Sequence, residues 1–267
     1  MKQSSLVALV SLCLGVVQPA FAQSAVPAAD AAQKQVDPLY TRAPDALQPK
    51  EVAELQKRLL DWAQLGRYRA DNAALAPPAA GERRVVFYGD SITDAWGRMQ
   101  GTTFFPGKPY VNRGISGQTT AQMLVRFRQD VIDLKPAAVV ILAGTNDLAG
   151  NTGVTTQRMI EDNLRSMTEL AQANHIKVVL ASVLPVSDYP WRPGLQPAPK
   201  VRALNAWIQQ YAQDHGVVYL DYHAKLGNRQ GGMDKALAYD GVHPTVAGYE
   251  AMAPLAQQAL DRALAQP

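Results

Sequence analysis

The sequence predicts an α/β fold in which helices cover both faces of a five-stranded parallel sheet. From Arg83 onward, short runs rich in β-branched residues alternate with longer amphipathic stretches, and such alternation is typical of strand–helix–strand units. The strand runs are almost continuously apolar, as expected for strands buried on both faces. Polar residues directly follow several of these runs, and in open parallel sheets ligands bind at the carboxyl ends of the strands.

The first 22 residues predict a signal peptide rather than part of the fold. A positively charged start, an apolar stretch at 6–17 and the small-x-small sequence Ala-Phe-Ala at 20–22 form the expected pattern. We expect cleavage after Ala22 and export to the periplasm or the medium. The apolar stretch is too short to span a membrane, so no stable membrane anchor is expected. The alternative is a buried N-terminal helix, whereas Leu12 before Cys13 disfavours a lipid-modified terminus.

Residues 23–80 are expected to hold a flexible leader and one amphipathic helix, ahead of the main domain at 81–267. The leader is rich in alanine, proline and glutamine. A helix is predicted over residues 50–68, because apolar residues recur there at spacings of three and four. This apolar stripe consists of Val52, Leu55, Leu59, Trp62 and Leu65. We expect the helix to pack as an appendage on the main domain, and the alternative is a helix that binds a partner.

Within the main domain, five strands and four longer helices are predicted in alternation. The strands are expected at residues 84–88, 110–112, 138–142, 177–181 and 217–220. The helices are expected at residues 120–134, 156–174, 201–215 and 245–265. Pro244 suits the start of the last helix, because proline is pre-organised for the first helical turn.

Composition excludes several classes of function. The 267 residues are 47% hydrophobic and 18% charged, which is ordinary for a globular protein. A net charge of +3 without a dense Lys/Arg tract does not indicate nucleic-acid binding. The single cysteine lies in the predicted signal peptide, so the mature chain has neither disulfides nor a cysteine nucleophile. No metal-binding His-Glu-x-x-His motif and no dinucleotide or P-loop motif is present, so neither a metal nor a cofactor is expected.

The candidate nucleophile follows the first predicted strand. The sequence Gly-Asp-Ser-Ile-Thr at 89–93 places Ser91 near the start of a helix, where the backbone amides favour negative charge. Gly89 permits a tight turn with close backbone approach. The alternative is that Asp90 and Ser91 serve only as helix caps.

Two further loops offer hydrogen-bond donors. Gly114, in the sequence Asn-Arg-Gly-Ile-Ser-Gly at 112–117, is expected to present an unobstructed backbone N–H to the cleft. Asn146, in the sequence Gly-Thr-Asn-Asp at 144–147, offers a neutral side-chain amide that can face a developing negative charge. Taken alone, each sequence is also explained by an ordinary loop or turn.

Asp240 and His243 predict the catalytic base. Their spacing of three lets the carboxylate meet the imidazole within one turn, fix its tautomer and leave the other ring nitrogen free. The alternative is a turn before the last helix whose histidine has no role. A nucleophile, a base, an orienting acid and oxyanion donors each occur once, and a serine hydrolase needs all of them.

In order along the chain, these four blocks resemble the SGNH (GDSL-type) esterase/lipase family. The resemblance covers residues 83–265 and is strongest to secreted bacterial acylhydrolases similar to platelet-activating-factor acetylhydrolase subunits. It implies a three-layer α/β/α sandwich, flavodoxin-like in strand order. It implies that Ser91 is the nucleophile, His243 the base and Asp240 the orienting acid. It also implies that the oxyanion donors are the amides of Ser91 and Gly114 and the side chain of Asn146.

The predicted activity is hydrolysis of carboxylic esters through an acyl-enzyme. Because no long apolar lid segment is present, the expected substrate is a short acyl group, above all acetyl, on a carbohydrate or other small alcohol. Trp96, Tyr189 and Trp191 are expected to line the alcohol site, and the alternative is that they pack in an ordinary loop. The other functions considered are a thioesterase or lysophospholipase of the same family, and a non-catalytic relative that binds glycans.

Overall fold

The computed structural model describes residues 42–266, and its centre is a five-stranded parallel sheet. The strands are β1 (Val85–Gly89), β2 (Tyr110–Gly114), β3 (Ala138–Leu142), β4 (Lys177–Ala181) and β5 (Val218–Leu220). Their order across the sheet is β2-β1-β3-β4-β5. Because the chain winds from β1 to one side and then to the other, the topological switch point lies between β1 and β3. Ligands bind beside the carboxyl ends of such strands.

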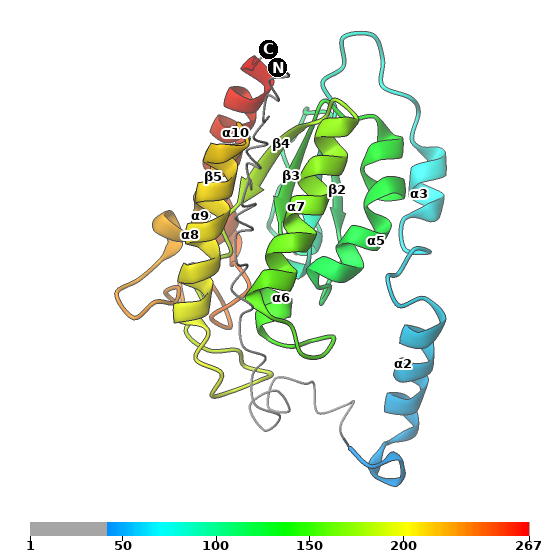
Figure 1. Cartoon of the computed structure of the whole chain (residues 1–267), viewed down its shortest axis with the longest axis vertical. Helices are drawn as coiled ribbons and strands as arrows, with labels where there is room; N and C mark the ends of the chain where they lie inside the picture. The colour runs from blue at the N-terminus through cyan, green and yellow to red at the C-terminus, as the bar shows by residue number, and fades with distance from the viewer. Residues whose placement is uncertain (1–41, 267) are drawn as a thin grey trace, which may run out of the picture.

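Helices connect the strands and cover both faces of the sheet (Figure 1). They are α4 (Ser91–Ala95), α5 (Thr120–Asp130), α6 (Thr145–Leu148), α7 (Gln157–Ala173), α8 (Ala198–Asp214), α9 (Tyr222–Leu226) and α10 (Val246–Ala265). The helix predicted over 120–134 ends at Asp130, because Val131 leaves the helical conformation before the short 3-10 turn η3 (Ile132–Leu134). No described helix is long and apolar enough to cross a membrane.

Successive residues of each strand face opposite sides of the sheet and enter two separate cores. On one side, Val86 and Tyr88 of β1 pack in a cluster with α5, α7 and α8. On the other side, Val85 and Phe87 pack in a cluster that α10 covers. The strands are therefore buried on both faces, and the predicted three-layer α/β/α fold is confirmed.

The N-terminal segment differs from the single predicted helix. Helix α2 (Pro49–Leu60) ends at Asp61, and a turn-rich stretch leads to a separate short helix, α3 (Arg69–Ala74). No residue of α2 is buried, and Figure 1 shows it projecting beyond the sheet while α3 lies near α5. The prediction of one continuous helix over 50–68 is therefore wrong, and the stretch after α2, rather than α2 itself, packs on the main domain. The predicted signal peptide and most of the leader lie outside the described residues.

Candidate active site

Ser91 is the first residue of α4, directly after the strand β1. Its Oγ lies 2.9 Å from Nε2 of His243, although 152 positions separate the two residues in sequence. The neighbouring Asp90 caps the helix by accepting a hydrogen bond of 3.0 Å from the N–H of Ile92. The two roles considered from sequence are thus divided: Asp90 is the cap, and Ser91 faces the imidazole.

His243 is held by Asp240 through both its ring and its backbone. The ring Nδ1 lies 2.7 Å from Oδ2 of Asp240, and the backbone N–H of His243 donates to Oδ1 at 2.7 Å. Burial raises the pKa of Asp240, but these hydrogen bonds outweigh it and hold the pKa below its usual value. Because an ionised carboxylate only accepts hydrogen bonds, Nδ1 carries the proton and Nε2 is free to accept one from Ser91.

Asn146 is buried in α6, just beyond the end of β3. Its Nδ2 donates to the carbonyl of Gln118 at 3.0 Å, and its Oδ1 accepts from Asn151 at 2.8 Å. These contacts fix the plane of the amide. They leave its second N–H without an acceptor among the described residues, and Asn146 lines the same pocket as Ser91. The amide is therefore pre-organised to donate into that pocket.

Gly114 does not present its amide to the pocket, and its assignment as an oxyanion donor is wrong. It is the last residue of β2, and its N–H donates to the side-chain oxygen of Asn112 at 2.9 Å. A Cβ built on Gly114 would lie 2.1 Å from the backbone nitrogen of Asp94. The residue is glycine because α4 packs directly on β2 at this point.

Gly117, three residues further on, occupies the expected position instead. It lines the pocket together with Ser91 and Asn146, and its N–H has no acceptor among the described residues. Its φ of +79° favours glycine. The carboxylate of Asp94 accepts hydrogen bonds from the N–H and the hydroxyl of Ser116, which tethers this loop to α4, the helix that begins with Ser91. The signal in the sequence was the Ser-Gly pair, because the strand continues through Gly114 and the loop begins only after it.

Gly114→Ala is expected to lower stability, whereas Gly117→Ala is expected mainly to lower kcat. Gly114→Ala should lower the free energy of unfolding by at least about 2 kcal/mol, because its Cβ meets fixed backbone. Gly117→Ala has open space for a Cβ and costs about 1–2 kcal/mol for the positive φ, but it should reduce kcat because the amide shifts. Urea unfolding and steady-state kinetics measure both effects. A Gly114→Ala protein of normal stability but low kcat would return Gly114 to the oxyanion hole.

Two buried ionisable groups near the site, Asp147 and Arg126, have roles that the sequence did not reveal, and Asp90, which was expected as a helix cap, is also buried. Burial raises the pKa of Asp90 to about 6 and that of Asp147 to about 7. Asp147 accepts hydrogen bonds from the N–H and the hydroxyl of Thr120, so it ties α6 to the start of α5. The fully buried Arg126 donates to the carbonyls of Gly89 and Arg113, at the ends of β1 and β2. These groups hold the segments that carry the site residues.

A cavity of about 800 Å³ opens over Ser91 and His243. The strand ends supply Gly117 and Asn146 to its lining, and the later loops supply Trp191 and Tyr239. Residues of α2 and of the stretch after it complete the lining. Within residues 42–266, no group of three or more metal-ligating side chains lies together.

The family model of GDSL-like lipases and acylhydrolases matches residues 87–251, which is more than half of the chain. The chain belongs to this family. The SGNH (GDSL-type) prediction is thereby confirmed, as is the classification as a carboxylic ester hydrolase.

Relatives of this GDSL family member include a lipase-like structure and an esterase. The GDSL-like lipase from Bacteroides thetaiotaomicron is 46% identical, with a TM-score of 0.72, over 75% of this chain and 98% of that one. An acetylxylan esterase from Geobacillus stearothermophilus is 27% identical over 204 residues, which cover 64% of this chain and 90% of that esterase. The Bacillus subtilis lipoprotein YqeF is 33% identical over 125 residues, or 40% of this chain. The match spans about half of that lipoprotein (51%), and such a relative is compatible with an exported protein.

The aromatic residues expected to line the alcohol site of this GDSL hydrolase behave differently from one another. Trp96 is buried against Phe87 and Tyr249 in the core, so its assignment as a lining residue is wrong. Tyr189 is also fully buried and does not line the cavity, so its assignment is wrong as well, and its hydroxyl donates to the carbonyl of Thr145 at 2.9 Å. It supports Trp191, whose ring lies 5.2 Å away.

Trp191 does line the cavity, with its ring 5.8 Å from that of His243. Tyr239, which was missed from sequence, also lines the cavity, and its ring stacks on the same imidazole with 5.7 Å between the ring centres. Its position directly before Asp240 was the available signal, because it lies one residue from the carboxylate that contacts His243. Two exposed aromatic rings thus lie within 6 Å of the imidazole of His243.

Proposed function

We propose that this hydrolase cleaves esters of short acyl groups by nucleophilic attack of Ser91, with His243 as base and Asp240 as orienting acid. The observation that carries the proposal is the continuous chain of contacts from Ser91 Oγ to His243 Nε2 (2.9 Å) and from Nδ1 to Asp240 (2.7 Å). Such a chain activates a hydroxyl that is otherwise a weak nucleophile.

In the first step, Ser91 Oγ attacks the acyl carbon while His243 Nε2 accepts the hydroxyl proton. The carbonyl electrons move to oxygen, and the resulting oxyanion accepts hydrogen bonds from the amides of Ser91 and Gly117 and from Asn146 Nδ2. When the tetrahedral intermediate collapses, the bond to the alcohol oxygen breaks and His243 returns its proton to the leaving alcohol. An acyl-serine remains.

In the second step, water replaces the alcohol. His243 removes a proton from a water molecule, whose oxygen attacks the acyl-serine carbonyl. Collapse of this second intermediate breaks the bond to Ser91 Oγ, which regains a proton from His243, and the carboxylic acid leaves. The net reaction consumes one water and yields one acid and one alcohol, and it draws on no cofactor.

The acyl group is proposed to be short, with acetyl as the reference case, and the alcohol to be a carbohydrate or other small polar alcohol. The lining of the cavity supports this substrate, because charged side chains such as Lys57 and Asp61 stand beside aromatic rings, and a long alkyl chain would desolvate those charges. The acetylxylan esterase relative points the same way.

A series of p-nitrophenyl esters from acetate to palmitate tests the acyl preference. We expect kcat/KM to be highest for acetate or propionate and to fall with every longer chain. A maximum at palmitate would contradict the proposal and favour the lysophospholipase function. Parallel assays on an acyl-CoA and a lysophospholipid separate the related hydrolases, and activity on none of these esters would favour a glycan-binding relative.

Export remains part of the proposal. The sequence pattern supports the proposed division of the chain into a signal peptide at 1–22, a leader with an N-terminal helix at 23–80 and a main domain from residue 81. The lipoprotein relative supports export, and the described part of the chain has no helix that spans a membrane.

A further inference from the structure

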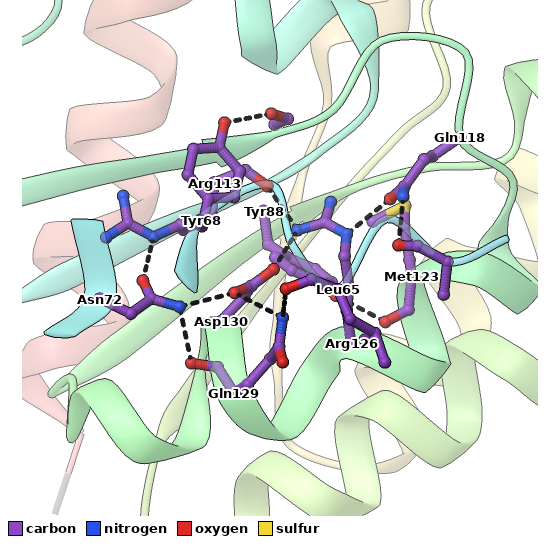
Figure 2. A network of polar contacts seen from close by, with 12 residues as sticks. Leu65, Tyr68, Asn72, Tyr88, Arg113, Gln118, Met123, Arg126, Gln129 and Asp130 are labelled. Carbon is purple, nitrogen blue, oxygen red and sulfur yellow. Dashed lines mark hydrogen bonds and ion pairs between the residues drawn. The ribbon is translucent and has the colours of Figure 1, made fainter. Parts of the chain in front are cut away.

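The stretch from Asp61 to Tyr68, between α2 and α3, is docked on the catalytic domain by side-chain amides. Three glutamines of α5 and the loop before it each donate to a backbone carbonyl of this stretch, and Figure 2 shows two of them, Gln118 and Gln129. The bonds run from Gln122 to Trp62 (2.6 Å), from Gln118 to Ala63 (2.8 Å) and from Gln129 to Leu65 (2.9 Å). Backbone that is otherwise irregular is therefore fixed in place.

Tyr68 anchors the far end of this stretch. Its ring is fully buried, and its hydroxyl donates to the carbonyl of Gly114. The guanidinium groups of Arg67 and Arg113 lie 4.8 Å and 4.7 Å from the centre of the ring, which adds cation–π attraction. In α3, Asn72 then donates to Asp130 at 2.7 Å, as Figure 2 shows. Both ends of the stretch are thus held against β2 and α5.

This docked stretch forms a wall of the catalytic cavity, although it lies ahead of the region that the family model covers. It contributes Asp61, Trp62, Gln64, Gly66 and Arg67 to the lining. Trp62 keeps 42% of its surface exposed, despite the bond that fixes its carbonyl. Trp191 (39% exposed) and Tyr239 (61% exposed) line the same cavity.

The chemistry of this wall fits a neutral ring that carries hydroxyl groups. Exposed aromatic faces offer apolar contact area at low cost in conformational entropy, and the C–H face of a sugar ring packs well on them. Acidic and basic groups, including Asp61 and Arg67, stand beside Trp62 and can accept from and donate to hydroxyls. A purely apolar leaving group would displace water from these charged groups and offer no hydrogen bond in return.

We infer that residues 61–67 are the specificity wall for the leaving alcohol, and that Trp62 stacks on a glycosyl ring of the substrate. This inference rests on the proposed esterase function and extends it to a segment outside the family region. Trp62 does not touch the reacting atoms. It selects which alcohol is held while Ser91 attacks.

The test compares two acetate esters that differ in the alcohol. Release of acetate from O-acetylated xylo-oligosaccharides and from ethyl acetate is measured for the full chain and for Trp62→Ala, Trp62→Phe and Leu60→Ala. Leu60 is the matched control, because it is a large apolar residue of the neighbouring helix that is 89% exposed and does not line the cavity. Thermal melts monitor the fold of each variant.

We expect Trp62→Ala to lower the ratio of kcat/KM for the oligosaccharides to that for ethyl acetate by about tenfold, the size of one aromatic contact. The loss should lie mainly in KM. Trp62→Phe should retain most of the ratio, and Leu60→Ala should leave it unchanged.

A wild-type ratio in Trp62→Ala, or an equal loss on both esters in a folded protein, would overturn the specificity wall and leave the esterase function intact. Hydrolysis of ethyl acetate without hydrolysis of the oligosaccharides by the wild-type chain would overturn the glycosyl assignment alone. Hydrolysis of neither ester would overturn the proposed function, and the inference with it.

Discussion

Ser91→Ala is expected to reduce kcat for ester hydrolysis by at least about 10,000-fold, because the alanine variant has no nucleophile to form the acyl-serine. The variant should also fail to label with a fluorophosphonate, which reacts only with an activated serine. Neither loss should come from unfolding, since Ser91 lies at a helix start that Asp90 caps. Activity assays, mass spectrometry of the labelled protein and a thermal melt measure all three.

Control variants test whether the loss of activity is specific to Ser91 or follows from the removal of any serine hydroxyl. Ser166→Ala, on α7, removes a hydroxyl that only bonds the carbonyl of Asp162, and it should keep normal labelling and activity. His243→Ala should lose nearly as much activity as Ser91→Ala, and the double variant should lose little more, because the two residues act as a unit. Labelling of the Ser91→Ala protein at the wild-type rate would show that another serine is the nucleophile.

Asn146→Ala is expected to lower kcat by about 100- to 1000-fold with a much smaller change in KM. The amide donates to charge that is present only in the transition state, so its removal leaves substrate binding nearly intact. The truncation also deprives the carbonyl of Gln118 of its hydrogen bond, which should cost about 1–3 kcal/mol of stability.

A second buried asparagine provides the control for that loss of stability. Asn205 of α8 bonds both the N–H and the carbonyl of Val183, at 2.8 and 2.9 Å, and does not line the catalytic cavity. Asn205→Ala should therefore lower the melting temperature without lowering kcat at a temperature where the protein is folded. If Asn146→Ala kept its kcat, the side chain would have no place in the oxyanion hole.

The parts of the site that follow strands could be predicted from sequence, because a parallel sheet gathers its carboxyl ends at one edge. This reasoning brought Ser91 and Asn146 to one place, whereas His243 was predicted from its spacing to Asp240, and the structure has all three around one cavity. It failed at Gly114, where the choice between two glycines depended on whether the strand ended before or after residue 114. The packing of β2 against α4 determines where the strand ends, and the local sequence pattern carries no information about that packing.

Other predictions failed because an apolar residue can either pack in the core or line a cavity, and the sequence does not distinguish the two. Trp96 and Trp191 both follow predicted strand ends, yet one is buried and the other lines the cavity. The apolar periodicity of residues 50–68 continued through Trp62 and Leu65, although both lie in an irregular stretch, where Trp62 lines the cavity and Leu65 is partly buried. Contacts with α5 and the loop before it, more than 50 positions away in sequence, determine that conformation, and periodicity carries no information about them.

The docking of residues 61–74 also bears on how shortened versions of this enzyme would behave. A protein that begins after Ala74 would expose the amide groups of Gln118, Gln122 and Gln129 and the carbonyl of Gly114 to solvent, since their partners would be gone. The loop that carries Gly117 starts just beyond that carbonyl. Any recombinant fragment meant to report on catalysis should therefore begin upstream of Asp61, because a shorter one would measure a wider and looser cleft than the intact enzyme has.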